Sequence, residues 1–132
     1  MVIEHGIEVN SLCSHHLLPF TGFCSLAYIS KENGQVIGLS KLNRIVHWFA
    51  KRPQLQEQLT RQIHDYLVNV FGDTVLGIAV YIEAEHMCVS MRGAEDNSTM
   101  TTHYCSGAFL TNEMNSRDEF LRAIQIYKLG RK

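Results

Sequence analysis

The sequence predicts an α+β fold built from an antiparallel sheet with two helices packed on one face. Stretches 20–29 and 75–83 are rich in aromatic and β-branched residues, as expected for strands, and stretch 99–110 is a further candidate. Between the first two, segment 40–72 repeats its apolar residues at helical spacing. The order of strand, two helices, strands and a final helix is typical of hairpin-like strands covered by helices.

Turn residues set the limits of the strands. Stretch 20–29 ends at the Lys-Glu-Asn-Gly sequence of 31–34, which is typical of a loop. Stretch 75–83 continues with extended character through 85–92. We therefore expect two long strands on either side of the helical segment.

Capping residues and one proline set the limits of the helices. Ser40 is the expected N-cap of the first helix, and Pro53 ends it and starts the second. Gly72 is the expected C-terminal stop. A final helix is expected from Ser116, with Glu119 completing a capping box. The apolar positions of these helices are Leu42, Ile45, Val46 and Phe49, then Leu55, Leu59, Ile63, Tyr66, Leu67 and Val70, then Phe120, Leu121 and Ile124.

The charge balance is nearly neutral. The 132 residues include 12 basic and 13 acidic side chains, which argues against attraction to nucleic acid or to anionic membranes. The first residues lack a basic region followed by an apolar stretch, so no signal peptide is expected. The apolar runs are too short to cross a bilayer. We expect a single domain over residues 1–132, with no nucleic-acid or membrane partner.

Four cysteines are present, at positions 13, 24, 88 and 105. Because the chain shows no secretory signal, a cytoplasmic location is expected, with the thiols free or bound to metal rather than paired in disulfides. Cys24 and Cys105 lie in strand-like stretches. We interpret both as small buried apolar groups.

Two short clusters, Cys13-Ser14-His15-His16 and His86-Met87-Cys88, offer two thiols and three imidazoles. This donor set suits zinc. Neither cluster has the Cys-x-x-Cys pattern of a structural zinc finger. Three protein ligands would leave one position open for a reactive water, so the clusters favour a catalytic metal site. A lone His or Cys is more often an ordinary core or surface residue than a metal ligand. Two clusters with compatible donor groups favour the metal site more than either cluster alone.

Spacing suggests how the clusters could converge. In an extended stretch, alternate residues share a face, so one face of 85–92 would carry His86, Cys88, Ser90 and Arg92. At the first cluster, Cys13 and His16 can converge around a turn. The two adjacent histidines point in different directions, so one is expected beside the metal as an acid–base partner.

The start of the first helix carries groups that suit an anion. Ser40 and Lys41 lie where free N–H groups and the helix dipole favour negative charge, and Arg44 follows one turn later. With Arg92 as a third cation, these groups would suit a phosphorylated ligand. A solvated helix face is the simpler reading of Lys41 and Arg44 taken alone.

Gln56 and Glu57 lie in the first turn after Pro53. An amide beside a carboxylate can bind the donor and acceptor edge of a purine or a pterin. Ordinary polarity at a helix start is the alternative, and spacing does not separate the two readings.

Four motifs together resemble the GTP cyclohydrolase I family. They occur in the family's order and with similar separations, and the resemblance extends from about residue 9 to residue 124. The motifs are Cys13-Ser14-His15-His16, stretch 36–46 (VIGLSKLNRIV), stretch 52–60 (RPQLQEQLT) and stretch 85–93 (EHMCVSMRG).

The resemblance implies a T-fold, whose antiparallel strands and paired helices assemble into a homo-oligomeric ring; a decamer of two stacked pentamers is one form of it. It implies zinc held by Cys13, His16 and Cys88, with His15 and His86 moving protons. Six polar side chains would contact GTP, the first two at guanine and the others at ribose and triphosphate: Glu57, Gln56, Ser40, Lys41, Arg44 and Arg92.

The implied reaction converts GTP and water to 7,8-dihydroneopterin triphosphate and formate. The pterin could serve folate, tetrahydropterin or deazapurine synthesis. Two alternatives stay open: a zinc hydrolase of the same fold that opens the ring of another purine nucleotide, and a weakly active regulatory or binding subunit.

The chain differs from the family pattern in two ways. Ser14 stands where the family usually has Glu, and losing a supporting carboxylate near a metal typically costs roughly ten- to a hundredfold in affinity or activity. In addition, only a short stretch precedes Cys13, where the family carries a helical segment. We therefore expect a short form of the enzyme.

Overall fold

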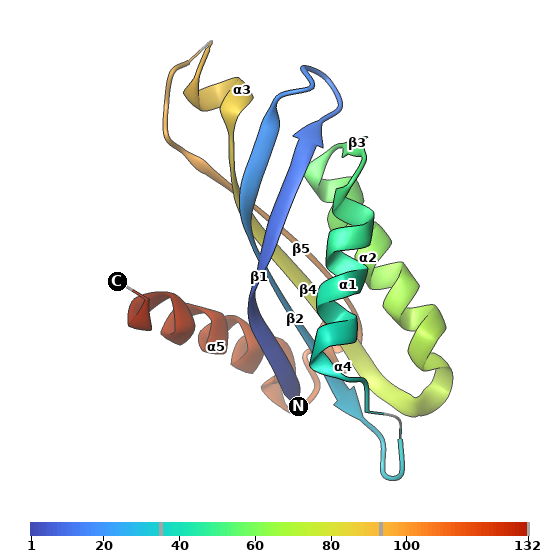
Figure 1. Ribbon diagram of the computed structural model, residues 1–132. Coiled ribbons are helices and arrows are strands. Elements are labelled where there is room, and N and C mark those ends of the chain that lie inside the picture. Colours follow the sequence, from blue (N-terminus) through green and yellow to red (C-terminus); the bar gives the residue numbers. More distant parts are fainter. Residues whose placement is uncertain (35, 93, 132) are drawn as a thin grey trace.

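The fold is a five-stranded sheet with helices on both faces, as seen in the computed structural model (Figure 1). The structure describes residues 1–34, 36–92 and 94–131. The strands are β1 (Val2–Cys13), β2 (Pro19–Ser30), β3 (Pro53–Gln54), β4 (Val75–His86) and β5 (Thr99–Gly107). The helices are α1 (Leu39–Ala50), α2 (Gln56–Phe71), α3 (Met87–Ser90), α4 (Ala108–Thr111) and α5 (Ser116–Gly130), with short 3₁₀ turns at Gly72–Thr74 and Glu113–Asn115.

The strand order is β3-β1-β2-β4-β5. All neighbouring pairs are antiparallel except β1 and β3, which run parallel. The long pairing of β2 with β4 brings Phe20 opposite His86 at one end of the sheet. The loops at that end therefore come from β1–β2 and from the chain after β4.

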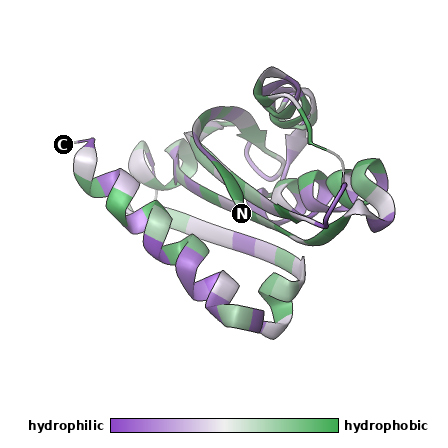
Figure 2. Ribbon diagram, turned by 90° about the horizontal axis from the view of Figure 1, so that it is seen from below, coloured by the Kyte–Doolittle hydropathy of each residue, from purple (hydrophilic) through white to green (hydrophobic). Residues whose placement is uncertain are grey.

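The alternating side chains of the strands form two cores. The larger core lies between the sheet and helices α1 and α2, and includes Leu26, Val80 and Ile82. The smaller core lies on the opposite face, where Phe109 of α4 and Phe120 of α5 pack over small residues of the central strands. Figure 2 shows helices on both sides of the curved sheet. The predicted α+β class, with two helices on one face as in a T-fold, is confirmed.

Several predicted boundaries are wrong by a few residues. The N-cap of α1 is Gly38, two residues before Ser40, and no side chain caps that helix. The second helix begins at Gln56, because Pro53 and Gln54 pair with the end of β1 as a short strand. The expected capping box at Ser116 is absent from α5, since the hydroxyl of that residue donates to the Ala108 carbonyl.

The predicted C-terminal stop of the second helix is confirmed. Gly72 ends α2 with a positive φ of 55°, a conformation that glycine adopts without strain. All four cysteines are free thiols. Cys24 is fully buried, whereas Cys105 is only partly buried. Among the described helices, none has the length and apolar character needed to cross a membrane.

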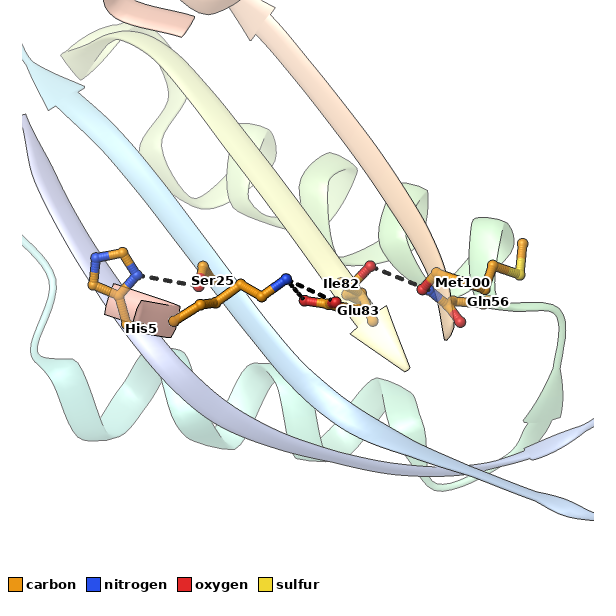
Figure 3. A network of polar contacts seen from close by, with 7 residues as sticks. His5, Ser25, Gln56, Ile82, Glu83 and Met100 are labelled. Atoms are coloured by element: carbon orange, nitrogen blue, oxygen red, sulfur yellow. Dashed lines mark hydrogen bonds and ion pairs between the residues drawn. The ribbon is translucent and has the colours of Figure 1, made fainter. Parts of the chain in front are cut away.

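The end of α5 is fastened to the sheet by residues of β1, β2 and β4. His5 stacks on Tyr127 with ring centroids 4.6 Å apart, and its Nδ1 lies 3.2 Å from the Ser25 hydroxyl. Lys128 forms an ion pair with Glu83 at 2.7 Å. Figure 3 shows the His5–Ser25 contact and the ion pair side by side. These contacts hold the last turns of α5 against the sheet.

The stability of the folded protein is expected to depend on pH through His5. Burial lowers the pKa of this imidazole below 6.5, so the unfolded chain binds the proton first as the pH falls. The free energy of unfolding should therefore decrease as the pH drops below about 6.5. The His5→Phe variant keeps an aromatic ring against Tyr127 but cannot titrate. Urea unfolding between about pH 5 and pH 8 should show a shallower decrease for the variant; equal slopes would contradict the prediction.

Candidate metal centre

The first cluster lies in the hairpin between β1 and β2. Cys13 is the last residue of β1, and its N–H donates to the Leu18 carbonyl at 2.9 Å. Leu17 takes a positive φ of 56°, which closes the turn. The short strand β3 supports the hairpin, because the Ser14 N–H donates to the Gln54 carbonyl at 3.1 Å. The Cys13 side chain is consequently buried at the end of the sheet.

The second cluster lies where β4 turns into helix α3. The prediction that 85–92 is extended is wrong beyond His86, because residues 87–90 form a helical turn closed by the Met91 N–H donating to the Met87 carbonyl at 2.9 Å. His86, Cys88, Ser90 and Arg92 therefore do not form one alternating row. A single four-residue turn has too few residues to show a helical period in the sequence. Gly93 lies outside the described residues.

The turn nevertheless brings three potential ligands together. One donor atom from each of Cys13, His86 and Cys88 lies within 4.8 Å of the other two. Two sulfurs and one imidazole nitrogen form a donor set that fits zinc. Within the described part of the chain, His16 does not belong to this group. Its assignment as a ligand stays a prediction of the resemblance.

The two thiols interact with each other and with a nearby cation. Burial raises the pKa of Cys88, and the adjacent Cys13 raises it further. The positive charge of Arg92 lowers the pKa of Cys88 and so opposes the effect of burial. The charge of Arg92 thus acts on the Cys88 thiol. Because a metal ligand must be a thiolate, metal binding here would release protons.

His86 is held on two sides. Its ring stacks on Phe20 with centroids 4.6 Å apart and planes 12° apart. Its Nε2 lies 2.7 Å from the Gln56 side-chain oxygen. Burial lowers the pKa of His86, and the charge of Glu57 only partly opposes this shift. The lowered pKa favours the neutral imidazole, which is the form needed for metal binding or proton uptake.

The two predicted guanine contacts differ in exposure. Glu57 is exposed in the first turn of α2, and its charge reaches His86. Gln56 is 1% exposed, and both ends of its amide bind other groups of the chain. Glu57 is thus free to meet a ligand, whereas a ligand contact by Gln56 stays a prediction of the resemblance.

The remaining histidines of the first cluster are exposed. The rings of His15 and His16 lie 6.2 Å apart with planes at 80°. The two side chains thus differ in orientation, as adjacent residues of a turn do.

The predicted phosphate contacts on α1 lie at the other end of the sheet. Asn43, on the same helix turn as Lys41 and Arg44, contacts the Glu4 carboxylate near the start of β1. Cys13 lies nine positions after Glu4 along β1, or about 30 Å. Figure 1 shows the start of α1 at the end of the molecule opposite α3. Within one chain, Ser40, Lys41 and Arg44 therefore do not converge with Arg92, and their contact with a phosphorylated ligand stays a prediction.

Phe20 is a residue of the site that sequence reasoning missed. Its stacking on His86 depends on the β2–β4 register, which pairs these two residues directly. The aromatic character of the strand was visible in the sequence, but its partner was not. Only the β2–β4 register, which pairs Phe20 with His86, would have identified Phe20 as a residue of the site.

Comparison with known proteins agrees with this geometry. The family model for GTP cyclohydrolase I matches residues 1–125. The chain is 51% identical over 126 residues to GTP cyclohydrolase 1 of Pseudoalteromonas translucida, covering 95% of this chain and 66% of that protein. It is 53% identical over 125 residues to GTP cyclohydrolase 1 1 of Pseudomonas syringae, covering 94% and 64%.

A third relative, GTP cyclohydrolase 1 of Chlorobium chlorochromatii, is 48% identical over 126 residues, covering 95% of this chain and 54% of that protein. The chain thus spans between about half and two thirds of the length of these relatives. The matched region contains the thiols of both clusters, His86 and the start of α2. The chain belongs to the GTP cyclohydrolase I family.

Proposed function

We propose that this chain acts as a zinc-dependent GTP cyclohydrolase I, which converts GTP and water to 7,8-dihydroneopterin triphosphate and formate. The observation that carries the proposal is the convergence of Cys13, His86 and Cys88, with the charge of Glu57 acting on His86. The family membership supports the same reading. In line with the free thiols, the proposed location is the cytoplasm.

In this proposal zinc is held by Cys13, Cys88 and His16. The two thiols already lie side by side, and His16 lies in the exposed turn that follows Cys13. His86 would not be a ligand in this proposal, because Phe20 and Gln56 hold its ring. When bound, zinc would supply Lewis acidity and a nucleophilic water at neutral pH.

The histidines would move protons during ring opening. His15 would donate a proton to the five-membered ring of guanine as the bond to C8 forms. His86, buried and favoured in its neutral form, would accept a proton near the thiols. Imidazole suits both tasks because it titrates near neutral pH.

Glu57 would anchor guanine through its carboxylate, which can accept from both N–H groups of the pyrimidine edge. Replacing Glu57 with alanine should weaken GTP binding by roughly 10- to 100-fold, because hydrogen bonds to a charged group contribute about 1.5–3 kcal/mol. Zinc content should not change, since Glu57 lies outside the group of ligands. Calorimetric titration with GTP and metal analysis of the same sample check both statements. Unchanged GTP affinity would remove Glu57 from the guanine site.

The triphosphate contacts require a second copy of the chain. Lys41 and Arg44 lie about 30 Å from the thiols along the sheet, a distance that one nucleotide does not bridge, whereas the charge of Arg92 acts on Cys88. The proposed assembly is a homo-oligomeric ring in which Ser40, Lys41 and Arg44 of one copy approach the metal centre of another. A decamer of two stacked pentamers is one such ring.

Incubation of zinc-loaded protein with GTP tests the proposed reaction. Formate and a fluorescent pterin triphosphate are expected, identified by mass spectrometry. A product that stops at the opened formamidopyrimidine would instead support a ring-opening hydrolase. Binding of GTP without any product would support a regulatory or binding subunit.

A further inference from the structure

Gln56 is a fully buried amide at the start of α2, held in one orientation. Its Nε2 lies 3.2 Å from the Ile82 carbonyl and 3.0 Å from the Met100 carbonyl, and Figure 3 shows the side chain reaching between these strands. Backbone carbonyls only accept hydrogen bonds. The nitrogen end of the amide must therefore face β4 and β5, and the oxygen end must face away from these carbonyls.

A chain of hydroxyls supports the same orientation independently. Thr60 donates to the Gln56 backbone carbonyl at 2.9 Å, so its single proton is used. The Thr102 hydroxyl, 2.7 Å from that of Thr60, must then donate to it. The oxygen of Thr102 is left to accept from Gln56 Nε2 at 3.0 Å. Each of these three hydrogen bonds requires that the nitrogen of the Gln56 amide, and not its oxygen, faces Thr102.

This orientation determines which nitrogen of His86 carries the proton. The Gln56 side-chain oxygen lies 2.7 Å from His86 Nε2 and can only accept. Nε2 must therefore be protonated, which leaves the lone pair on Nδ1. The stack on Phe20 fixes the plane of the ring at the same time. The tautomer and the orientation of His86 are thus both set from outside the metal centre.

We propose that Gln56 is a positioning residue, which holds His86 as the Nε2–H tautomer and so leaves Nδ1 as the basic atom of a ring that lies beside the two thiols. This inference rests on the proposed function for its catalytic consequence, and it assigns Gln56 a role other than guanine contact. The partner that fixes the tautomer of a histidine at a metal site typically changes affinity or activity by ten- to a hundredfold.

Nitrogen NMR of the chain, as purified and after zinc loading, tests the tautomer directly. With the histidine rings labelled with ¹⁵N, His86 of the unmodified protein should show a proton bonded to Nε2 at about pH 8, where a histidine is neutral. Protonation at Nδ1 instead would overturn the proposal, and this result needs no variant.

The Gln56→Leu variant tests the consequence. Its leucine keeps much of the buried volume but cannot accept from His86, so a mixture of both tautomers is expected. The kcat for GTP should fall by roughly ten- to a hundredfold with KM unchanged. A raised KM, with the tautomer of His86 and kcat unchanged, would show that Gln56 contacts guanine and would overturn the proposal.

Ser106→Ala is the matched control. It removes a hydrogen bond of 2.8 Å to His64 from the same interface of α2 and β5, without touching Gln56. The tautomer of His86 should be unchanged in this variant; a tautomer change of the same size as in Gln56→Leu would mean a general loosening of the interface and would contradict the proposal. If the protein turns over no GTP at all, the proposed function fails, while the NMR result still decides the role of Gln56.

Discussion

Cys88→Ala is expected to lose both bound zinc and turnover. Cys88 is one of two thiols in the ligand group, and its sulfur lies within 4.8 Å of the donor atoms of Cys13 and His86. Two remaining ligands would not hold zinc in a tetrahedral site. The decrease in turnover should exceed the roughly 100-fold that losing a supporting residue costs. Metal analysis after gel filtration and formate release measure the two losses.

Two comparisons sharpen this result. Cys105→Ala removes a partly buried thiol in the smaller core and should keep both zinc and turnover. His16→Ala should lose zinc, whereas His86→Ala should keep zinc and lose turnover. Stoichiometric zinc in the Cys88 variant would refute the thiol site. Zinc retained by the His16 variant and lost by the His86 variant would exchange the roles of the two histidines.

Two inactive variants are expected to regain activity when they assemble together. One is Cys88→Ala, and the other combines Lys41→Ala with Arg44→Ala. Since these groups lie about 30 Å apart in one chain, a site must take them from different copies. In a mixed ring made from equal amounts, roughly a quarter of the sites would contain both intact sets. Co-expression followed by formate measurement should therefore recover roughly a quarter of the normal activity.

The matched control pairs Cys88→Ala with His86→Ala. Both residues belong to the same cluster of one chain, so no mixed site is complete and no recovery is expected. Equal recovery in both mixtures would indicate a general effect of co-expression. No recovery in the first mixture, with mixed rings shown by native mass spectrometry, would place the phosphate contacts elsewhere.

Much of the fold could be predicted from local patterns. The apolar spacing of Leu59, Ile63 and Leu67 marks the buried side of α2, and Gly72 marks its end. The strand β1 was missed, because Gly6 and neighbouring polar residues interrupt its alternation at a bulge between Glu4 and Ile7. Pairing with β2 stabilises this strand, and the alternation within β1 alone does not reveal that pairing.

The site was predictable in composition but not in arrangement. Spacing identified Cys13 and Cys88 as a pair that could share a metal, and the structure brings them together. It also grouped His86 with Cys88, but through an extended row that helix α3 replaces beyond His86. It did not show that Lys41 lies at the opposite end of the sheet, since the direction of α1 relative to β1 depends on packing.

The zinc dependence of formate release tests the central claim most directly. Metal-free protein should release no formate from GTP, and stepwise addition of zinc should raise the rate to a plateau at about one zinc per chain. Pterin triphosphate should form in step with formate. Formate release at the full rate without zinc, or none with zinc bound stoichiometrically, would contradict the account.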